Sequence, residues 1–259
     1  MHPLAIPSLV LPFPQIDPVI FSVGPLSVHW YGLAYVAGIL LGWWFARRVV
    51  INNTLWPSTG SPIRQIELDD FLTWAVIGII FGGRLGYVIF YNLSKYIQEP
   101  LSIFAVWDGG MSFHGGAIGS IIAMVLFARS RGFSPYSLLD VIATASCFGL
   151  FFGRIANFIN AELWGRTTDV AWAFKFPVRD NFGQIAGYTD PRHPSQLYEG
   201  ALEGIVLLLV LILLIFGLKK LRFPGFIGGA WVSVTGSLAS LLNSSANRMP
   251  ISATSMVDG

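Results

Sequence analysis

Six long apolar stretches alternate with shorter polar segments along the chain, at residues 31–46, 71–91, 115–128, 138–159, 201–218 and 226–242. A membrane-spanning helix needs about 17–25 residues, so the second, fourth and fifth stretches qualify outright and the others need flanking aromatic residues or glycines. The stretches are continuously apolar and lack the two-residue alternation of a membrane β-barrel strand. The pattern therefore predicts an all-α, polytopic membrane helix bundle of about six spans.

Composition agrees with a membrane protein. Of the 259 residues, 54% are hydrophobic and only 12% are charged, and the mean hydropathy is +0.63. These values exclude a soluble globular domain of ordinary composition. The formal net charge is only +2, and the basic residues lie at the ends of the apolar stretches, so nucleic acid is not an expected partner. The expected surroundings are the lipid bilayer.

The positions of the basic residues predict the orientation of the spans. Three polar connections are basic, and they contain Arg47, Arg48 and Arg64, then Arg129 and Arg131, then Lys219, Lys220 and Arg222. Because basic connections stay in the cytoplasm, the N-terminus, which lacks Lys and Arg over residues 1–29, should lie outside. Prolines in that tail break any signal-peptide helix, so no cleaved signal is expected. By alternation, the polar stretch 162–196 also lies outside, as a small head.

Two arginines lie late within apolar stretches, Arg84 in the second and Arg154 in the fourth. A charge at the centre of a span costs at least about 2.5–3.5 kcal/mol by insertion scales, so it usually serves a site, a cavity or a partner. One interpretation is that the arginines bind an anionic substrate. The alternative is that each reaches the interface or pairs with Asp108, Glu162 or Glu199.

The neighbours of Arg154 favour a site. On a continuous helix Arg154, Asn157 and Ala161 share a face, and Glu162 lies one step round, so cationic, amide and carboxylate groups could converge on a phosphodiester. Arg166 then adds a second arginine just beyond the span. The structural alternative is a helix C-cap at Glu162, followed by a solvated turn.

Polar motifs also stand where apolar stretches begin. His114 lies between a polar loop and the third stretch, flanked by glycines that let the backbone bend. A histidine there is often a capping or interface residue, but an ordinary pKa of about 6.5 makes it the best general base near neutral pH. Tyr31 opens the first stretch, where aromatic residues are expected anyway. His193 and Glu199 open the fifth.

Other residue patterns predict packing. Gly78, Gly82 and Gly86 recur at a spacing of four, which lets the second span approach a neighbouring helix closely. The single cysteine, Cys147, lies in an apolar segment and is expected to pack there. The four histidines and this cysteine are scattered without ligand spacing, so no metal site is expected.

Five motifs carry a resemblance: HWYG at 29–32, GGRLGYV at 82–88, VWDGGMSFHGG at 106–116, GRIANFINAELWGR at 153–166 and RHPSQLYE at 192–199. In this order, over about residues 14–228, they resemble the prolipoprotein diacylglyceryl transferase family. The resemblance implies a bacterial inner-membrane protein of seven spans with a periplasmic head and a periplasmic N-terminus. It implies no cofactor.

The resemblance also implies a reaction. The diacylglyceryl group of phosphatidylglycerol is transferred to the thiol of a lipobox cysteine in a prolipoprotein, the first step of lipoprotein maturation. By matching motifs, His114 takes the thiol proton and Arg154 contacts the lipid phosphate. The same matching places further residues around the substrates, namely Tyr31, Arg84, Asn157, Glu162, Arg166, His193 and Glu199.

The family pattern is lost after Gly228, where another arginine motif and the last span are expected. Codons can be chosen for residues 230–250 so that a second reading frame, which begins at the third base of the first codon, encodes LGFGYGVARIVVEFFREPDA. This shifted peptide restores the missing motif. We therefore expect residues 1–228 to be a transferase-like domain, and 229–259 to be a frame-shifted tail that is disordered or poorly packed. Little or no activity is expected from the chain as written, because its second phosphate-binding arginine is lost.

Two rival functions remain open at this point. A transporter for an anionic or lipid substrate would use Arg84 and Arg154 as ligands, but it predicts related halves or broken helices, which the sequence lacks. A non-catalytic remnant would differ from the enzyme only in the tail.

Overall fold

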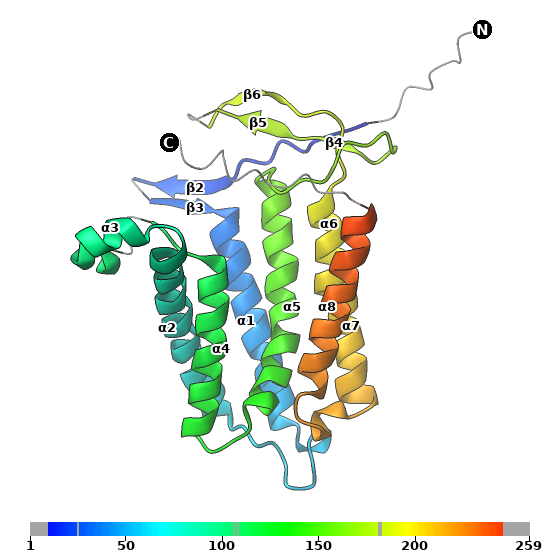
Figure 1. Ribbon diagram of the computed structural model, residues 1–259. Coiled ribbons are helices and arrows are strands. Elements are labelled where there is room, and N and C mark those ends of the chain that lie inside the picture. Colours follow the sequence, from blue (N-terminus) through cyan, green and yellow to red (C-terminus); the bar gives the residue numbers. More distant parts are fainter. Residues whose placement is uncertain (1–9, 25, 106, 108, 181–182, 246–259) are drawn as a thin grey trace. The chain divides into compact units, whose positions relative to one another are not determined.

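The computed structural model describes residues 10–24, 26–105, 107, 109–180 and 183–245. Five of its helical runs are long and apolar enough to cross a membrane: α1 (Trp30–Ile51), α2 (Gln65–Phe90), α4 (Phe113–Ser130), α5 (Pro135–Ile159) and the run Ser195–Gly217 (Figure 1). The sixth predicted span is the helix α8 (Phe226–Ser245), whose apolar part, Phe226–Leu238, is shorter. The prediction of a polytopic membrane helix bundle is confirmed.

The chain divides into two compact units. Unit 1 comprises residues 1–42, 145–212 and 230–259, and unit 2 comprises residues 43–144 and 213–229. Part of the predicted tail belongs to α8, since this helix continues to Ser245. The prediction of disorder for residues 246–259 lies outside the described residues.

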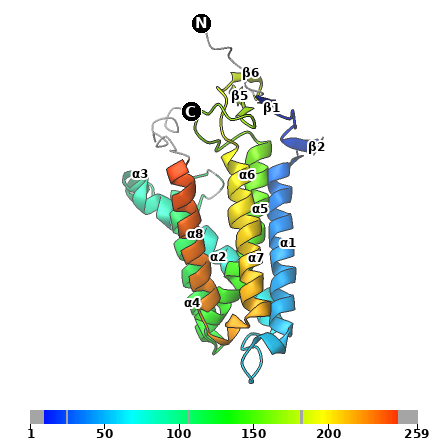
Figure 2. The ribbon, with the colours of Figure 1, turned by 90° about the vertical axis from the view of Figure 1, so that its right-hand side faces the viewer.

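In unit 1 the fifth span is a helix of mixed type. It begins as α6 (Ser195–Glu199), widens into the π-helical segment η4 (Gly200–Val206), and continues as α7 (Leu207–Ile212) (Figure 2). A second π-helical segment, η5 (Leu213–Gly217), follows in unit 2. π-Helical turns are rare and often occur at functional sites.

Short strands build the polar part of unit 1. β1 (Leu11–Pro12) pairs in parallel with β4 (Phe174–Lys175), while two antiparallel pairs join β2 (Val19–Val23) to β3 (Leu26–His29) and β5 (Pro177–Arg179) to β6 (Ile185–Tyr188). Beside these strands lies a small aromatic core of Phe13, Phe158, Ala161 and Phe176, with Trp164, Phe174 and Leu197 packed against it. The N-terminal segment therefore packs with residues of the stretch 162–196.

In unit 2, α2 and α4 are in close backbone contact along a stripe of glycines. A Cβ atom built on Gly86 would lie 2.8 Å from the Cα of Gly115, and one on Gly78 would lie 2.6 Å from the carbonyl oxygen of Gly119. Neither position has room for a side chain. The predicted close approach of the second span to a neighbour is confirmed, and the neighbour is α4.

We expect Gly119→Ala to destabilise the α2–α4 pair by about 1–3 kcal/mol, because the added methyl group would strike the carbonyl oxygen of Gly78. Gly149→Ala is the matched control, since a Cβ on Gly149 meets no atom within 4 Å. That substitution should be neutral or stabilise α5 by about 0.5–1 kcal/mol. Thermal unfolding in detergent micelles measures both effects, and equal melting temperatures for the two variants would contradict the packing argument.

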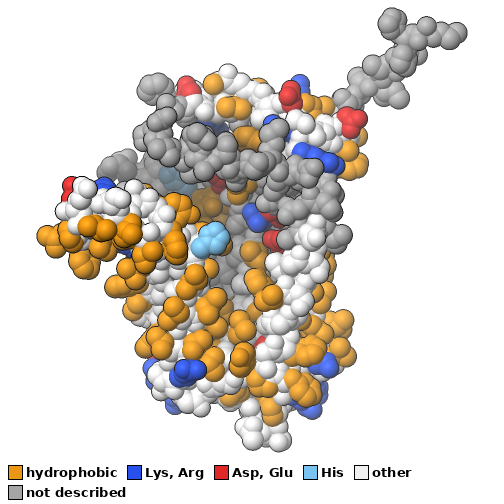
Figure 3. Space-filling model, in the orientation of Figure 1, with side chains coloured by type: hydrophobic (Ala, Val, Ile, Leu, Met, Phe, Trp, Pro, Cys, Tyr) orange, Lys and Arg blue, Asp and Glu red, His pale blue; other side chains and the backbone are white. Residues whose placement is uncertain are grey.

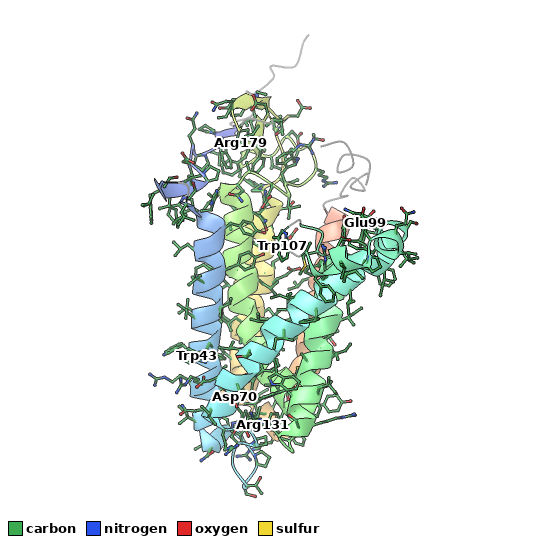
Figure 4. The ribbon with its side chains drawn as sticks, turned by 90° about the vertical axis from the view of Figure 1, so that its left-hand side faces the viewer. Trp43, Asp70, Glu99, Trp107, Arg131 and Arg179 are labelled. Atoms are coloured by element: carbon green, nitrogen blue, oxygen red, sulfur yellow. The ribbon has the colours of Figure 1, made fainter. Side chains whose placement is uncertain are left out.

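Unit 2 has polar contacts near the basic connections between its helices, and Figure 4 labels three residues there: Trp43, Asp70 and Arg131. Arg131 pairs with Asp70 at 2.6 Å, and the indole of Trp43 donates to Asp69 at 2.7 Å. Asp140 is fully buried and accepts hydrogen bonds from the backbone N–H groups of Gly225 and Gly228, at 2.8 and 2.7 Å. This carboxylate thereby holds the start of α8.

Three short helices complete unit 2: η1 (Asn53–Leu55), α3 (Leu93–Gln98) and η6 (Lys220–Arg222), with the 3-10 turn η2 (Pro100–Phe104) after α3. Hydrophobic side chains cover much of the visible helical surface (Figure 3). Examples on α2 are Val76 and Phe81, which are 54% and 62% exposed. Such surfaces suit contact with lipid acyl chains.

Candidate functional site

Arg154 is the centre of a buried ionic cluster in unit 1. Its Nη2 atom lies 2.7 Å from Oε2 of Glu199 and 3.7 Å from Oε2 of Glu203. The Arg154 side chain is 25% exposed, whereas that of Glu199 is only 3% exposed. Buried carboxylates need such a partner, because an unpaired charge away from water is strongly destabilising. The predicted alternative of an ion pair with Glu199 is present.

Glycines bring this cluster together. Gly200 and Gly204 face α5, and a Cβ atom on Gly204 would lie 2.6 Å from the Cβ of Phe151. A Cβ on Gly200 would lie 3.3 Å from the Cβ of Arg154. Because neither glycine has a side chain, the backbone of the fifth span approaches α5 closely enough for Glu199 to reach the guanidinium.

Glu203 is a member of this cluster that the sequence analysis missed. It lies within the π-helical segment η4 and is 8% exposed. The signal was present in the sequence, since Glu203 is an acidic residue inside an apolar stretch and stands four positions after Glu199. These two ion pairs use Nη2 of Arg154, and the arginine side chain remains 25% exposed. The guanidinium is therefore partly accessible from outside the cluster.

A second polar group lies at the C-terminal end of α5. The side-chain amide of Asn157 donates to Oε1 of Glu162 at 2.7 Å and lies 3.5 Å from the hydroxyl of Tyr31. The amide of Gln196 donates to the backbone carbonyl of Glu162. Tyr31, Asn157 and Glu162, all predicted site residues, are therefore brought together, and Gln196 joins them as a further residue.

The geometry of this turn corrects the predicted continuous helix. α5 ends at Ile159, and Ala161 has a φ of 55°, in the left-handed region. The Glu162 N–H bonds to the Asn157 carbonyl at 3.0 Å and the Ala161 N–H to the Phe158 carbonyl at 2.9 Å, as in a Schellman motif. Ala161 therefore does not extend the helical face of Arg154. Glu162 returns to Asn157 through this C-terminal turn, in which the cap position is Asn160 and Glu162 lies two residues beyond it.

His193 and Arg166 lie on adjoining loop segments. The His193 N–H donates to the Arg166 carbonyl at 3.1 Å, and the Gly165 N–H donates to the His193 carbonyl at 2.9 Å. Nδ1 of His193 lies 3.2 Å from the Tyr198 hydroxyl, which also accepts a hydrogen bond from Trp172 at 2.7 Å. Burial, and then the positive charge of Arg166, lower the pKa of His193 below its ordinary value of 6.5.

This shift predicts a pH dependence of stability. Since the unfolded chain binds a proton on His193 more readily, stability should be full above about pH 6.5 and should fall as the pH drops toward the lowered pKa. Arg166→Gln removes one of the two causes, so the pKa of His193 should rise in that variant. NMR titration of the imidazole measures this change directly. A pKa unchanged by Arg166→Gln would contradict the electrostatic contribution.

The other two predicted site residues lie in unit 2. His114 is an exposed residue in the first turn of α4, and its ring meets that of Phe113 edge to face, with centroids 5.8 Å apart. Beside it is an apolar groove of about 480 Å³, which Phe113, Met111 and Ile79 line together with Gly83, Ser112, Gly116, Ala117 and Ser120. An exposed imidazole beside an apolar groove suits a proton acceptor for a lipid-borne or membrane-inserted substrate.

Arg84 is 5% exposed, and its guanidinium donates to backbone carbonyls between residues 102 and 110. Those hydrogen bonds use Nε, Nη1 and Nη2, so every nitrogen of the group is engaged. This arrangement disfavours the predicted role of Arg84 as a direct substrate ligand. The physical reason is that a phosphate would have to displace the carbonyls that satisfy this buried cation.

Comparisons with known proteins give a consistent result. A family model described as "Prolipoprotein diacylglyceryl transferase" matches residues 18–242. A phosphatidylglycerol–prolipoprotein diacylglyceryl transferase of Rhizobium leguminosarum bv. trifolii is 57% identical over 223 residues, which cover 86% of this chain and 76% of that protein. Proteins of the same name from Brucella ovis and Brucella abortus are each 54% identical over 231 residues, or 89% of this chain and 79% of theirs.

Proposed function

This chain belongs to the prolipoprotein diacylglyceryl transferase family, and from that membership we propose that Arg154 binds the phosphate of phosphatidylglycerol while His114 activates a cysteine thiol. The protein is a membrane transferase that moves the diacylglyceryl group of phosphatidylglycerol to a prolipoprotein. Our proposal concerns the residues that perform this transfer and the peptide that receives the group, a signal peptide with a lipobox cysteine.

The observation that carries the proposal is the Arg154 cluster. A guanidinium near the end of a span, with a side chain that is one quarter exposed, can bind a phosphodiester with charge-assisted hydrogen bonds. Glu199 and Glu203 hold the group in place before the lipid arrives. Asn157, Glu162 and Tyr31 form a separate hydrogen-bonded group at the same helix end, which suits the hydroxyl groups of the glycerol headgroup.

The reaction balances with these groups. The cysteine sulfur attacks the glyceryl carbon that carries the phosphate ester, so a C–S bond forms and the C–O bond to phosphate breaks. The electron pair of that bond remains on the phosphate oxygen, and glycerol 1-phosphate leaves. A free thiol has a pKa near 8.5, so His114 accelerates the step by accepting the thiol proton. Arg154 stabilises the charge that develops on the phosphate.

We further propose that the site lies at the periplasmic side of a bacterial inner membrane. The basic connections all belong to unit 2 and include Arg47, Arg131 and Lys220. The positive-inside rule assigns such connections to the cytoplasm. By alternation of spans along the sequence, both His114, at the start of one span, and Arg154, near the end of the next, are then assigned to the opposite side, as is the N-terminus.

The frame-shifted tail remains part of the proposal. The family model extends to residue 242, but residues after Gly228 lack the expected arginine motif. We propose that the bases now read as Leu238 and Ala239 once encoded that arginine. Without it, one guanidinium fewer is present to stabilise the leaving phosphate, so turnover by the chain as written should be low.

Reconstitution in liposomes tests the proposed function. The chain and a version with the downstream frame restored are each supplied with phosphatidylglycerol and a synthetic lipobox peptide, and the peptide is analysed by mass spectrometry. We expect a thioether-linked diacylglyceryl group on the cysteine peptide, mainly with the restored version, and none on a serine peptide. A folded, lipid-binding restored protein that never modifies the cysteine would overturn the proposal, as would transport of phosphatidylglycerol without any transfer.

A further inference from the structure

Arg84 combines deep burial with a complete set of backbone acceptors. Its guanidinium makes five hydrogen bonds: Nε to the carbonyl of Ile103 (2.8 Å), Nη1 to Gly109 (2.5 Å) and Gly110 (3.2 Å), and Nη2 to Ser102 (2.7 Å) and Ala105 (2.9 Å). The ring of Tyr96 lies 5.2 Å from the guanidinium carbon. Since a guanidinium has five N–H donors, this set of acceptors matches its full capacity.

The acceptors lie in η2 and in the residues that follow it before α4, so Arg84 ties the backbone of this segment to α2. Its backbone bonds to its own neighbours are local, such as Ser102 N–H to Glu99 and Ala105 N–H to Ser102. Gly109 and Gly110 have φ values of 78° and 79°, a conformation that favours glycine. Two successive left-handed residues direct both carbonyls to one nitrogen of the guanidinium.

The same segment leads directly to His114. After Gly110, the N–H of Ser112 bonds to the carbonyl of Gly83 at 2.9 Å, next to Arg84 in α2. Ser112 then caps α4 by accepting from the N–H of Gly115 at 3.2 Å. His114 lies in this capped turn, and its exposed ring has an aromatic contact with the adjacent Phe113. The position of the imidazole is therefore fixed by the backbone that Arg84 and Gly83 hold.

We infer that Arg84 is a positioning residue for His114 rather than a ligand of the lipid phosphate. The inference rests on the proposed function of His114 as the proton acceptor. Lysine cannot replace Arg84, because its three donors on a single nitrogen cannot reach carbonyls that are spread over residues 102–110. Loss of these bonds would let the segment move and would change the position and surroundings of the imidazole at the start of α4.

The test compares Arg84→Lys with Arg154→Lys in two assays on the protein in detergent micelles. The first is the rate of modification of His114 by diethylpyrocarbonate, followed by peptide mass spectrometry from pH 5 to 8, because the reagent reports both access to the neutral imidazole and its titration. The second is binding of phosphatidylglycerol, measured against phosphatidylcholine. We expect Arg84→Lys to change the rate of His114 modification at a given pH by at least about threefold. The affinity for phosphatidylglycerol should stay within about twofold of the original. Arg154→Lys should instead weaken the binding of phosphatidylglycerol and leave the rate of His114 modification unchanged.

Two further variants protect the test against misfolding. Gly110→Ala keeps Arg84, but its Cβ would lie 2.5 Å from the ring of Tyr87, so it should alter the His114 profile in a similar way. Lys95→Gln removes a nearby exposed positive charge and should change neither assay. If Arg84→Lys weakens lipid binding as Arg154→Lys does and leaves His114 unchanged, Arg84 is a phosphate ligand and the inference is wrong. If the parent chain fails to bind phosphatidylglycerol at all, the proposed function fails, whereas the His114 profile still decides the role of Arg84.

Discussion

Replacement of Arg154 by glutamine will weaken phosphatidylglycerol binding by about 100-fold, because truncating one partner of a buried, hydrogen-bonded charge pair typically costs 2–5 kcal/mol. Glutamine offers the phosphate no positive charge. Lysine keeps the charge but loses the planar, bidentate geometry. The phosphatidylglycerol affinity of Arg154→Lys should therefore lie between those of the original protein and Arg154→Gln. Binding to nanodiscs that contain phosphatidylglycerol or phosphatidylcholine, with identical acyl chains, measures the effect.

The control for this prediction must separate binding from folding. Arg154→Gln removes the ion pairs of Arg154 with Glu199 and Glu203, and removing one partner of a buried ion pair costs about 3–5 kcal/mol of stability. The double variant Arg154→Gln with Glu203→Gln removes one of these charges and should recover stability but not lipid binding. Arg179→Gln is the charge-matched control: Arg179 is an exposed residue of β5 whose guanidinium donates to the Gly183 carbonyl at 2.8 Å (Figure 4). Equal lipid affinities for Arg154→Gln and Arg179→Gln would exclude Arg154 as the phosphate ligand.

Restoring the downstream reading frame will raise the transfer rate by at least about 100-fold, since removal of one donor to a developing anion typically costs 10²–10³ in rate. The restored protein differs from the present chain only after Gly228. Transfer of the diacylglyceryl group to a lipobox peptide is the measurement. Binding of phosphatidylglycerol should change far less, because Arg154 is present in both proteins.

A single substitution separates the arginine from the rest of the restored segment. In the restored protein, changing only the arginine of the recovered motif to glutamine should return the rate to that of the present chain. Full activity in that variant would show that the segment acts through its last span and not through its guanidinium. Full activity in the present chain would show that the tail is dispensable.

The membrane helices could be predicted from the sequence because apolar length is the dominant signal for a span. The first apolar stretch, 31–46, is shorter than the helix it predicts, which runs from Trp30 to Ile51. The extra turn contains Arg47 and Arg48, which a hydropathy pattern excludes but which helix geometry tolerates at the membrane surface. The glycine stripe of α2 was also predicted from its spacing of four, whereas Gly115 and Gly119 on α4, which have the same spacing, were not identified as its partner.

The polar parts were less predictable, because their partners are backbone groups or distant in sequence. Arg84 stood out as a charge in a span, but its acceptors are carbonyls, which carry no signal in the residue types. The pairing of β1 with β4 joins two-residue strands more than 160 positions apart, too short for any periodicity. The π-helical segment that carries Glu203 has no sequence signature either, whereas Glu203 itself could have been found.

The central claim is that the Arg154 guanidinium holds the lipid phosphate, and a distance measurement tests it most directly. Rotational-echo double-resonance NMR between the ³¹P of phosphatidylglycerol and ¹⁵N-labelled arginine side chains would be recorded on the reconstituted protein and on Arg154→Lys. We predict dephasing that corresponds to a phosphorus–nitrogen separation of about 4 Å or less, as in a direct guanidinium–phosphate contact, and its loss in the variant. Dephasing of the same size in both proteins would place the phosphate on another arginine and contradict the account.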